Sequence, residues 1–528
     1  MCGRLKAARL AFMVCTACSA FASLGAVVFV DKDNTSGFED GFTWPTAFTT
    51  IQAAIDAVYS GGGGEVWVAE GIYDEPRTAL FDQNPLPDQE LWFNLGSIML
   101  PDGVELLGGF AGGESRKDER DWEANETTLD GSVARDGESA FHVIKMTGEA
   151  IVDGFTITGG NACGGHDSGA SGGILGARGT VSNCKFIGNR ACGGPGALGG
   201  RVTLINCEFA GNQSNDGDGA VSMGGVVQGC VFRDNAGSEA GALGVSRAIT
   251  VSNCVFINNE GRREGGALSV QDVHYLGLTT QIIENCVFAH NRVLGTSGDQ
   301  GYGGAIEFQS SEARVDNCLF YGNSAENAGA AVAAWGYAND DGEILTGPVT
   351  FTNCTFSGNS APEGRGGVSY YPVAVFRNCI LWDNIGGELV PPPTYWIYEV
   401  EYSLVKGGTE GPGNIDSNPL FVDTVNEDFR LQAGSPAIDT GTLEGAPATD
   451  IRGVPRPQGA GVDMGAYEYQ AGDEADVDGS GTTDAVDVQL VINGALGLDS
   501  RAGLDVDGNG VIDAIDVQMV INWALGVG

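Results

Sequence analysis

The stretch Asn183-Cys184-Lys185-Phe186-Ile187-Gly188-Asn189 is the first full copy of the motif that decides the fold. In every copy an Asn lies five residues after the Cys, and the residue two after the Cys is Phe in seven copies and Leu in the eighth. The Cys-to-Cys spacings are 23, 23, 24, 32, 32, 36 and 25 residues. A constant core with variable insertions is typical of a stacked repeat protein. The later copies lie at Cys207, Cys230, Cys254, Cys286, Cys318, Cys354 and Cys379.

The spacing inside one copy predicts its shape. The Cys and the Phe alternate with period two, so both side chains face the same side of a short strand. An apolar residue such as Val181 lies three residues before each Cys, and an offset of three cannot share that face on one straight strand. A corner must separate them, and Asn, or Gly229 in one copy, tolerates the left-handed conformation that a corner needs.

The second Asn marks the next corner, and a Gly-rich segment with a third apolar strand follows it, as at residues 265–268. Three short strands and three corners in one repeat predict one coil of a parallel β-helix. Coils stack about 4.8 Å apart, so equivalent residues should form ladders of Cys, Phe and Asn.

The repeat resembles that of the right-handed single-stranded parallel β-helix, or pectin-lyase-like, superfamily. Within it, the repeat is most similar to secreted bacterial proteins with polymorphic outer-membrane-protein-type repeats. The resemblance covers roughly residues 100–400 and implies a mainly β fold. It implies little about function, because this fold occurs in lyases, glycosidases, adhesins and inert stalks.

Composition narrows the class of protein. The 528 residues include 84 Gly and carry a formal net charge of −42. The glycines show no three-residue period and cluster at the corners, which indicates turns rather than collagen or disorder. The strong negative charge argues against binding to nucleic acid or to an anionic membrane surface. It suits a soluble extracellular protein or one that gathers Ca²⁺.

The pattern of the cysteines does not indicate a disulfide framework. Stacked Cys side chains point the same way, so their Cβ atoms lie about 4.8 Å apart, beyond the roughly 3.5–4.5 Å that a disulfide prefers. We therefore expect the eight motif cysteines to be buried free thiols. Cys163 and Cys192 occupy similar Ala-Cys-Gly-Gly turns outside the ladder, and their pairing stays open.

The N-terminal part of the chain divides into two predicted segments. Residues 1–22 have the positive start, apolar run and Ala20-Phe21-Ala22 cleavage site of a signal peptide, which predicts secretion. No later stretch is long and apolar enough to span a bilayer, so no transmembrane anchor is expected. Residues 23–416 are assigned to the β-helix, with a helix near residues 48–59 covering its first coil.

Residues 417–470 follow the last coil and include Asp463-Met464-Gly465-Ala466-Tyr467-Glu468. This segment resembles the choice-of-anchor closing segments of bacterial β-helices, and we interpret it as a C-terminal cap.

The last module, residues 471–528, contains two halves. Residues 476–497 and 505–526 are identical at 16 of 22 positions, and each half is an EF-hand-type loop followed by an amphipathic helix. The module resembles a type I dockerin, which implies Ca²⁺ as cofactor and a cohesin-like or cell-surface protein as partner. The candidate ligands are Asp476, Asp478, Ser480, Thr482, Asp484 and Asp487 in the first loop, and Asp505, Asp507, Asn509, Val511, Asp513 and Asp516 in the second.

One pair of positions departs from the dockerin pattern. Loop positions 10 and 11, which in cellulosomal dockerins often carry a Ser-Thr-like pair, are Ala485-Val486 and Ala514-Ile515. This difference argues against recognition of a standard cohesin.

The three longest repeats carry insertions with aromatic residues. Insertions in a solenoid often project from one side and form its binding face. Exposed aromatic rings there could stack on sugars, so these residues are candidate polysaccharide-binding residues. Alternatively, they pack the inserted loops onto the coils. The candidates are Tyr275, Tyr302, Trp335 and Tyr337.

The sequence leaves catalysis open. None of the pectinase or lyase motifs sought is present, and the catalytic residues are unknown; the isolated acids Glu264, Glu307 and Asp316 are unranked candidates. We favour a secreted β-helix protein displayed through a Ca²⁺-dependent dockerin and engaged in polysaccharide binding or catabolism. The alternatives are a polysaccharide lyase or O-glycosyl hydrolase, and a non-catalytic adhesin or stalk.

Overall fold

A computed structural model describes most of the chain. The predicted signal peptide lies outside the described residues. None of the described helices is long and apolar enough to cross a membrane. The described ranges are 26–77, 80–82, 92–163, 170–271, 280–295, 301–309, 311–335, 337–338, 344–345, 348–370, 373–389, 397–470, 475–478, 483–499, 502–506 and 511–525.

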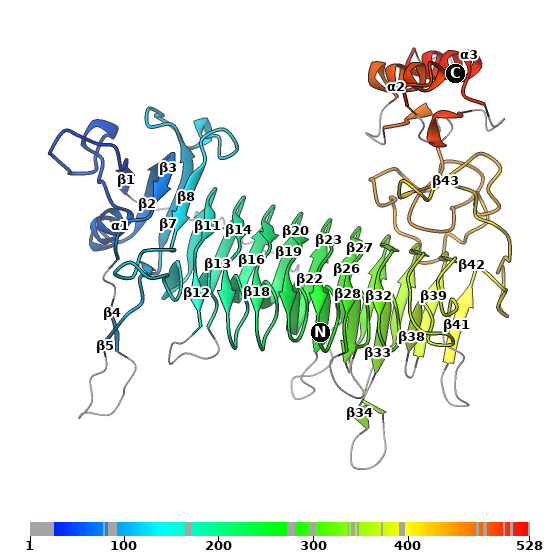
Figure 1. The fold of residues 1–528 in the computed structure, drawn as a ribbon, viewed down its shortest axis with the longest axis horizontal. Helices are drawn as coiled ribbons and strands as arrows, with labels where there is room; N and C mark the ends of the chain where they lie inside the picture. The colour runs from blue at the N-terminus through cyan, green and yellow to red at the C-terminus, as the bar shows by residue number, and fades with distance from the viewer. Residues whose placement is uncertain are drawn as a thin grey trace, which may run out of the picture.

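The central body is a parallel β-helix whose coils contribute strands to three sheets; among the described residues, seven coils contribute a strand to the third (Figure 1). The mainly β, parallel β-helix prediction is confirmed. The largest sheet contains β1 Ala26–Val30, β2 Gly64–Ala69, β6 Ile98–Leu100, β7 Val104–Phe110, β9 Ile144–Met146, β10 Ala150–Asp153, β13 Ile174–Ser182, β16 Leu198–Ile205, β19 Val221–Gln228, β22 Leu243–Ser252, β25 Leu268–Gln271, β26 Gln281–Glu284, β29 Ile306–Gln309, β30 Ala313–Asp316, β33 Val332–Trp335, β36 Val349–Thr352, β38 Val368–Tyr370, β39 Val373–Arg377 and β41 Ile397–Glu401.

The second and third sheets are built from shorter strands. The second contains β3 Gly71–Tyr73, β8 Thr127–Asp130, β11 Thr156–Thr158, β14 Lys185–Ile187, β17 Glu208–Ala210, β20 Val231–Arg233, β23 Val255–Ile257, β27 Val287–Ala289, β31 Leu319–Tyr321, β37 Thr355–Ser357, β40 Ile380–Trp382 and β42 Leu404–Val405. The third contains β12 Asn161–Ala162, β15 Arg190–Ala191, β18 Gln213–Ser214, β21 Ala236–Gly237, β24 Glu260–Gly261, β28 Arg292–Val293 and β32 Ser324–Ala325.

Two kinds of corner bend each coil. The Asn before the Cys adopts a positive φ, as in Asn183 at 51° and Asn253 at 54°, and Gly229 takes φ 64° at the same place. This corner is the predicted one. At the next corner the left-handed residue is the one before the second Asn, for example Gly188 at 63°. The second Asn itself turns inward and is buried, as in Asn189.

Two of the three long insertions interrupt a strand of the largest sheet, whereas that of the Cys286 repeat lies between β28 and β29. Where the repeat is short, one long strand such as β22 runs along the sheet. In the longer repeats that strand is divided in two, giving the pairs β25 and β26, β29 and β30, and β33 and β36. The two halves keep the register of the undivided neighbour, since Leu243 pairs with Leu268 and Val251 with Ile283. The insertions therefore leave the stacking of the coils intact.

Equivalent residues form ladders through the core. Phe186, Phe209 and Phe232 stack with centroids 4.7 and 4.8 Å apart, close to the rung spacing of the sheet. The eight motif cysteines are buried free thiols, as predicted. Cys163 and Cys192 form a disulfide, which resolves the pairing left open by the sequence.

The first coil is covered by helix α1, Ile51–Ser60, which buries Ile51, Ala54, Ile55 and Val58 against β1, β2 and β6. The helix matches the predicted spacing and lies at the N-terminal end in Figure 1. Short elements complete this end: 3₁₀ helices η1 Trp44–Thr46 and η2 Lys117–Glu119, and the hairpin of β4 Leu80–Asp82 and β5 Trp92–Asn94.

Residues 417–470, here called the closing segment, pack against the side of the last coils. The corner residues Asn317, Asn353 and Asn378 donate from their side-chain amides to closing-segment carbonyl oxygens at 2.7–2.9 Å. Inside the segment Arg456 and Glu468 form a buried ion pair at 2.7 Å. Its one hairpin among the described residues joins β43 Phe421–Asp423 to β44 Asp428–Leu431.

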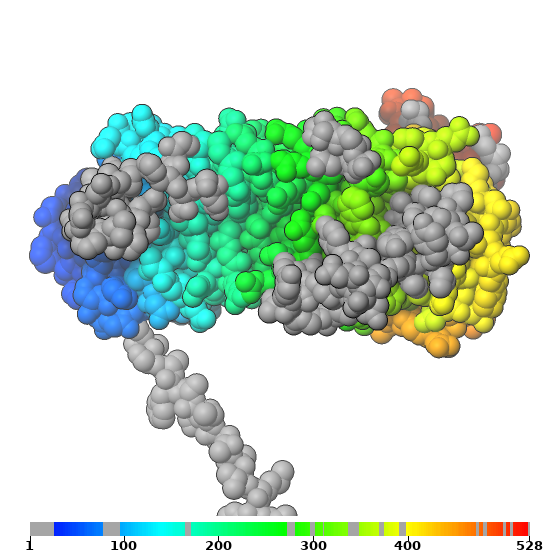
Figure 2. Space-filling model, turned by 90° about the horizontal axis from the view of Figure 1, so that it is seen from below, coloured from blue at the N-terminus to red at the C-terminus, as the bar shows by residue number. Residues whose placement is uncertain are grey.

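Figure 2 shows the coils in chain order along one elongated body, with colours running from blue to yellow. The small hairpin of β34 Tyr337–Ala338 and β35 Ile344–Leu345 projects from this body in Figure 1. The closing segment and the C-terminal helices lie on the opposite side of the coils from that hairpin.

Candidate calcium-binding and docking site

The first C-terminal loop gathers three carboxylates in front of helix α2, Ala485–Ala495. One side-chain oxygen from each of Asp476, Asp478 and Asp487 lies within 4.8 Å of the others. Asp487 is buried, and its two oxygens accept hydrogen bonds from the backbone N–H groups of Asp478 at 3.0 Å and Asp484 at 2.7 Å, which compensate for the lost contact with water. Asp484 caps the helix by accepting from the Val486 N–H at 2.7 Å.

The second loop repeats this construction before helix α3, Ala514–Ala524. Asp513 accepts from the Ile515 N–H at 2.7 Å, and the buried Asp516 accepts from the N–H groups of Asp513 and Val506, both at 2.8 Å. The capping bond and the bond from the N–H at loop position 9 are thus equivalent in the two halves, whereas the remaining donor is Asp478 at loop position 3 in the first half and Val506 at loop position 2 in the second. Asp505 and Val511 also lie within the described residues, whereas the predicted ligands Ser480, Thr482, Asp507 and Asn509 lie outside them.

The two halves pack around one small apolar core. Val491 from α2 and Val520 from α3 are fully buried, together with Leu504 of the 3₁₀ helix η5, Ala502–Leu504. Gly494 permits this packing, because a Cβ at its position would lie 2.8 Å from a Leu504 methyl carbon. The loops are thus held by a core that buries few large side chains.

The predicted sugar-binding aromatic residues are only partly described. Trp335, at the end of β33, is 39% exposed, and its ring centroid lies 4.7 Å from that of Tyr302 at an interplanar angle of 53°. The structure thus brings together two residues that are distant in the sequence. Tyr337 lies in β34, but its side chain is outside the described residues, as is all of Tyr275.

Carboxyl groups gather beside this aromatic pair. Oε2 of Glu264 accepts from Ser269 Oγ and Gln271 Nε2, both at 2.8 Å. Oε2 of the fully buried Glu307 accepts from the Gly265 N–H at 3.1 Å. Burial, and then repulsion by Glu264, raise the pKa of Glu307 well above its usual value. Glu264 and Glu307 are both among the candidate catalytic acids predicted from the sequence.

Two further acids extend this group. Burial, with repulsion by Glu239, raises the pKa of Asp218 to about 7, and burial with repulsion by Glu264 raises the pKa of Glu239. Sequence reasoning missed both residues. A sequence pattern could have identified them: an acid directly precedes the small residues that lead into a strand, as in Glu239-Ala240-Gly241 and Glu264-Gly265-Gly266. The third candidate acid, Asp316, instead pairs with Arg314 at 2.6 Å.

Comparison with known protein families supports the two-part architecture. Residues 122–275 match the family model of the right-handed beta helix region, and residues 474–525 match that of the dockerin type I domain. The chain combines a right-handed β-helix with a type I dockerin.

Among curated proteins, none shows significant similarity to the chain. Among solved structures, pectate lyase Pel9A is similar, with 17% identity, a TM-score of 0.45, and coverage of 84% of this chain and 96% of that enzyme. The catalytic unit of the GH87 α-1,3-glucanase from Streptomyces thermodiastaticus strain HF3-3 is 15% identical, with a TM-score of 0.36 and coverage of 70% and 65%.

The dockerin loops fit calcium. Type I dockerins bind this ion, and clustered carboxylate oxygens such as those of Asp476, Asp478 and Asp487 are the donors that Ca²⁺ prefers. When bound, Ca²⁺ would supply the positive charge that balances these carboxylates. Asp484 and Asp513, predicted ligands at position 9, are both committed to helix capping through one oxygen, Oδ1.

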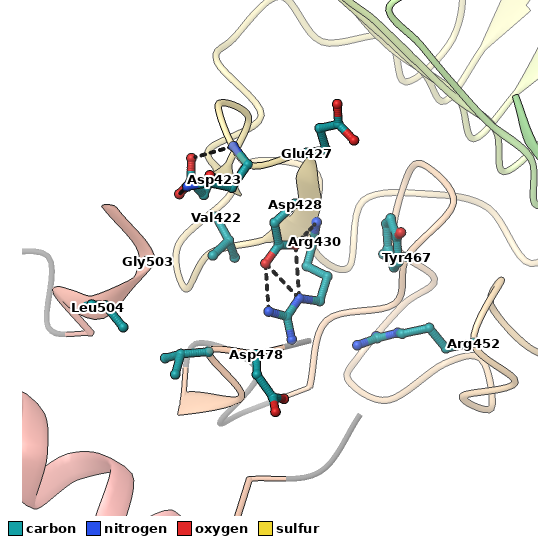
Figure 3. Close-up of a pocket in the computed structure, with 12 residues that line it drawn as sticks. Val422, Asp423, Glu427, Asp428, Arg430, Arg452, Tyr467, Asp478, Gly503 and Leu504 are labelled. Carbon is teal, nitrogen blue, oxygen red and sulfur yellow. Dashed lines mark hydrogen bonds and ion pairs between the residues drawn. The ribbon is translucent and has the colours of Figure 1, made fainter. Parts of the chain in front are cut away.

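The dockerin also contacts the closing segment. Arg430 of β44 donates to Asp476 twice, from Nη1 to Oδ2 at 3.0 Å and from Nη2 to the backbone oxygen at 2.8 Å. The same guanidinium is held by Asp428 at 2.6 Å. Figure 3 shows Arg430 and Asp428 beside a cavity of about 370 Å³ whose other side carries Asp478 and Leu504 of the dockerin. A predicted calcium ligand is therefore also an attachment point between the two units.

Proposed function

We propose that this protein is a secreted β-helix protein that a calcium-dependent dockerin attaches to a partner protein, and that its solenoid engages polysaccharide. The observation that supports this most directly is the pair of matching loop-helix units with converging aspartates. Dockerins typically bind cohesins, so a cohesin-like module is the expected partner class. Residues 1–22, read as a signal peptide, support an extracellular or cell-surface location.

The partner-facing surface of the dockerin should be apolar at its centre. Val486 and Ile515 occupy equivalent places at the starts of α2 and α3 and are 52% and 56% exposed. A hydroxyl-bearing pair would present donors and acceptors there, whereas these side chains offer only apolar surface. The matching cohesin should therefore carry an apolar patch, since the buried centres of protein interfaces are depleted in charge.

A capture experiment tests the docking role. The full chain is passed over a panel of immobilised cohesins in the presence of Ca²⁺ and again with EDTA, which removes the ion. We expect capture by at least one cohesin in Ca²⁺ only, and its loss in Val486→Asp combined with Ile515→Asp. Val425→Asp, at an 86% exposed residue of the closing segment, is the matched control. Capture that persists in EDTA would contradict the proposal.

The polysaccharide role rests on the pair formed by the exposed Trp335 and the partly exposed Tyr302. An aromatic ring that is partly exposed and supported by a second ring offers a flat apolar surface suited to the face of a sugar. This observation favours a binding function. Tyr275 and Tyr337 remain predicted contributors to the same function.

A further inference from the structure

The outer face of the largest sheet carries a short row of polar and aromatic side chains on β25, β29 and β33. Leu268 and Val270 point into the core, so Ser269 and Gln271 face outward. The strand register places Ser269 beside Glu307, and Gln271 beside Gln309 and then Trp335. Residues from three successive coils therefore meet on one outer surface.

The corner beside these strands adds two more residues to the same surface. Glu264 and Tyr302 each precede the small residues that lead into β25 and β29, and the Gly266 N–H donates to the Gly303 carbonyl oxygen at 2.9 Å. Glu264 reaches Ser269 and Gln271, and Tyr302 packs against Trp335. We call the set the Trp335 patch; it consists of Glu264, Gln271, Tyr302, Glu307, Gln309 and Trp335.

Within the described part of the chain, one buried atom of the Trp335 patch has no hydrogen-bond partner. Oε1 of Glu307 is buried and, among the described residues, accepts no hydrogen bond of normal geometry. Trp335 and Gln309 approach this carboxyl closely enough to lower its pKa, but neither makes such a bond to Oε1. Buried polar atoms without partners are rare in native proteins, and each needs a physical reason. A ligand oxygen or hydroxyl that completes the site provides one.

We propose that the Trp335 patch binds an uncharged sugar chain, with Trp335 and Tyr302 contacting the apolar face of a ring and Glu264 accepting hydrogen bonds from its hydroxyl groups. This inference rests on the proposed function and names its substrate class. A neutral sugar offers both the apolar ring face and the hydroxyl donors. Glu307, beneath the surface, is a positioning residue: its Oε2 holds the Gly265 N–H, and its Oε1 is open to a hydrogen bond from a ligand hydroxyl.

The surrounding charges favour an uncharged ligand over a uronate. Glu264 lies within electrostatic range of Asp218, Glu239 and Glu307. The nearby Arg263 is already paired with Asp216 at 2.6 Å. A sugar carboxylate placed beside Glu264 would meet like charge without a free counterion from this set, which is unfavourable in a partly buried site. Polygalacturonate and alginate should therefore be rejected.

Affinity retention of the full chain tests the proposal. The probes are cellulose, curdlan and galactomannan as neutral polymers, and polygalacturonate and alginate as anionic ones, all in Ca²⁺ so that the dockerin stays folded. We expect retention on at least one neutral polymer and none on the anionic ones. Trp335→Ala should lower that retention roughly tenfold or more, as for a central aromatic anchor. Glu264→Gln should lower it about tenfold through loss of charge-assisted hydrogen bonds.

Two variants separate the site from general effects. Trp122→Ala removes another surface tryptophan, 37% exposed, and Glu312→Gln removes another acid, and both should bind as the wild type does. Retention that neither Trp335→Ala nor Glu264→Gln reduces would overturn this site but leave the proposed function standing. Stronger retention on an anionic polymer would overturn the substrate class. Retention on none of the probes would overturn both this inference and the polysaccharide part of the proposed function.

Discussion

Asparagine has two separate structural roles within one coil. The corner Asn before each Cys supplies a backbone conformation: Asn253 has φ 54° and is exposed, and Gly229 replaces it one coil earlier. The second Asn supplies hydrogen bonds: Nδ2 of Asn235 donates to Phe209 O at 2.9 Å and to Asn259 Oδ1 at 3.0 Å, and its own Oδ1 accepts from the Asn212 N–H at 2.9 Å. The first role tolerates glycine and the second does not.

Replacing a ladder asparagine should therefore be costly. Asn235→Ala leaves buried groups of Asn212, Phe209 and Asn259 without partners, and we expect a loss of about 3 kcal/mol or more, given roughly 1–3 kcal/mol per unsatisfied group. Asn253→Gly should cost about 1 kcal/mol or less, because glycine adopts the same φ freely. Denaturant unfolding of the two variants gives the comparison. Equal losses would refute the distinction between the two positions.

The eight stacked motif cysteines should be unreactive toward thiol reagents in the native protein. Burial raises the pKa of Cys184 to about 12, and all eight motif cysteines are buried, so none should react with a thiol reagent in the native protein. In denaturant without reductant, peptide mapping should show all eight modified. Cys163 and Cys192 should react only after reduction, because they are bonded to each other. Modification of Cys207 or Cys254 in the native state would show that the ladder is accessible to solvent.

At the scale of elements, the parts that repeat could be predicted and the parts that do not repeat could not. The shape of the coil could be predicted from the spacing of Cys, Phe and Asn, because every copy of the motif has the same spacing and must fit the same geometry. The calcium loops could be predicted because the coordination of the metal sets the spacing of their aspartates. The gathering of Glu264, Glu307 and Trp335 could not be predicted, because it depends on the register between coils separated by insertions of different length.

The end of the Asn ladder should respond to pH. Glu388 accepts hydrogen bonds from the backbone and side chain of Asn384, and burial raises its pKa from 4.5 to about 7. Between those values the folded chain holds a proton that the unfolded chain releases, so this group's contribution to stability falls as pH rises from about 4.5 to 7 and is constant above that range. Glu388→Gln should reduce the fall in melting temperature between pH 5 and pH 8. A slope identical to that of wild type and of the control Glu312→Gln would exclude Glu388 as a source.

The helices α2 and α3 should depend on calcium for their stability. Their shared core is small, and the carboxylates in front of α2 repel one another without a cation. Hydrogen exchange in the full chain should show α2 and α3 amides exchanging on the order of 100-fold faster in EDTA than at a Ca²⁺ concentration 100 times Kd. Strands β19 and β22 should be unaffected. Asp476→Ala with Asp505→Ala should reproduce the effect of EDTA, and helices equally protected with and without Ca²⁺ would disprove it.

At the scale of the whole molecule, the closing segment joins two units with different tasks. On one side its backbone carbonyls accept from corner asparagines of the last coils, and on the other Arg430 reaches Asp476 of the dockerin. In Figure 1 the segment lies between the coils and the C-terminal helices. The face that carries the Trp335 patch and the projecting hairpin is thereby kept away from the face that presents the dockerin. One partner can hold the protein while the other face stays open.

The contact between Arg430 and Asp476 should set the position of the dockerin on the solenoid. Both side chains are 7% exposed, and breaking such a buried pair is costly, because the remaining charge stays buried without compensation; the cost is typically about 3–5 kcal/mol. Arg430→Gln removes the positive charge and the two guanidinium nitrogens that donate to the carboxylate and to the backbone oxygen of Asp476. We expect the dockerin to move freely, so that small-angle X-ray scattering in Ca²⁺ reports a larger maximum dimension than in the wild type. Arg314→Gln removes an ion pair elsewhere on the solenoid and should leave the scattering unchanged. If Arg430→Gln gives the wild-type profile, then the apolar residues along the cavity, Val422, Val477 and Leu504, are sufficient to hold the two units together.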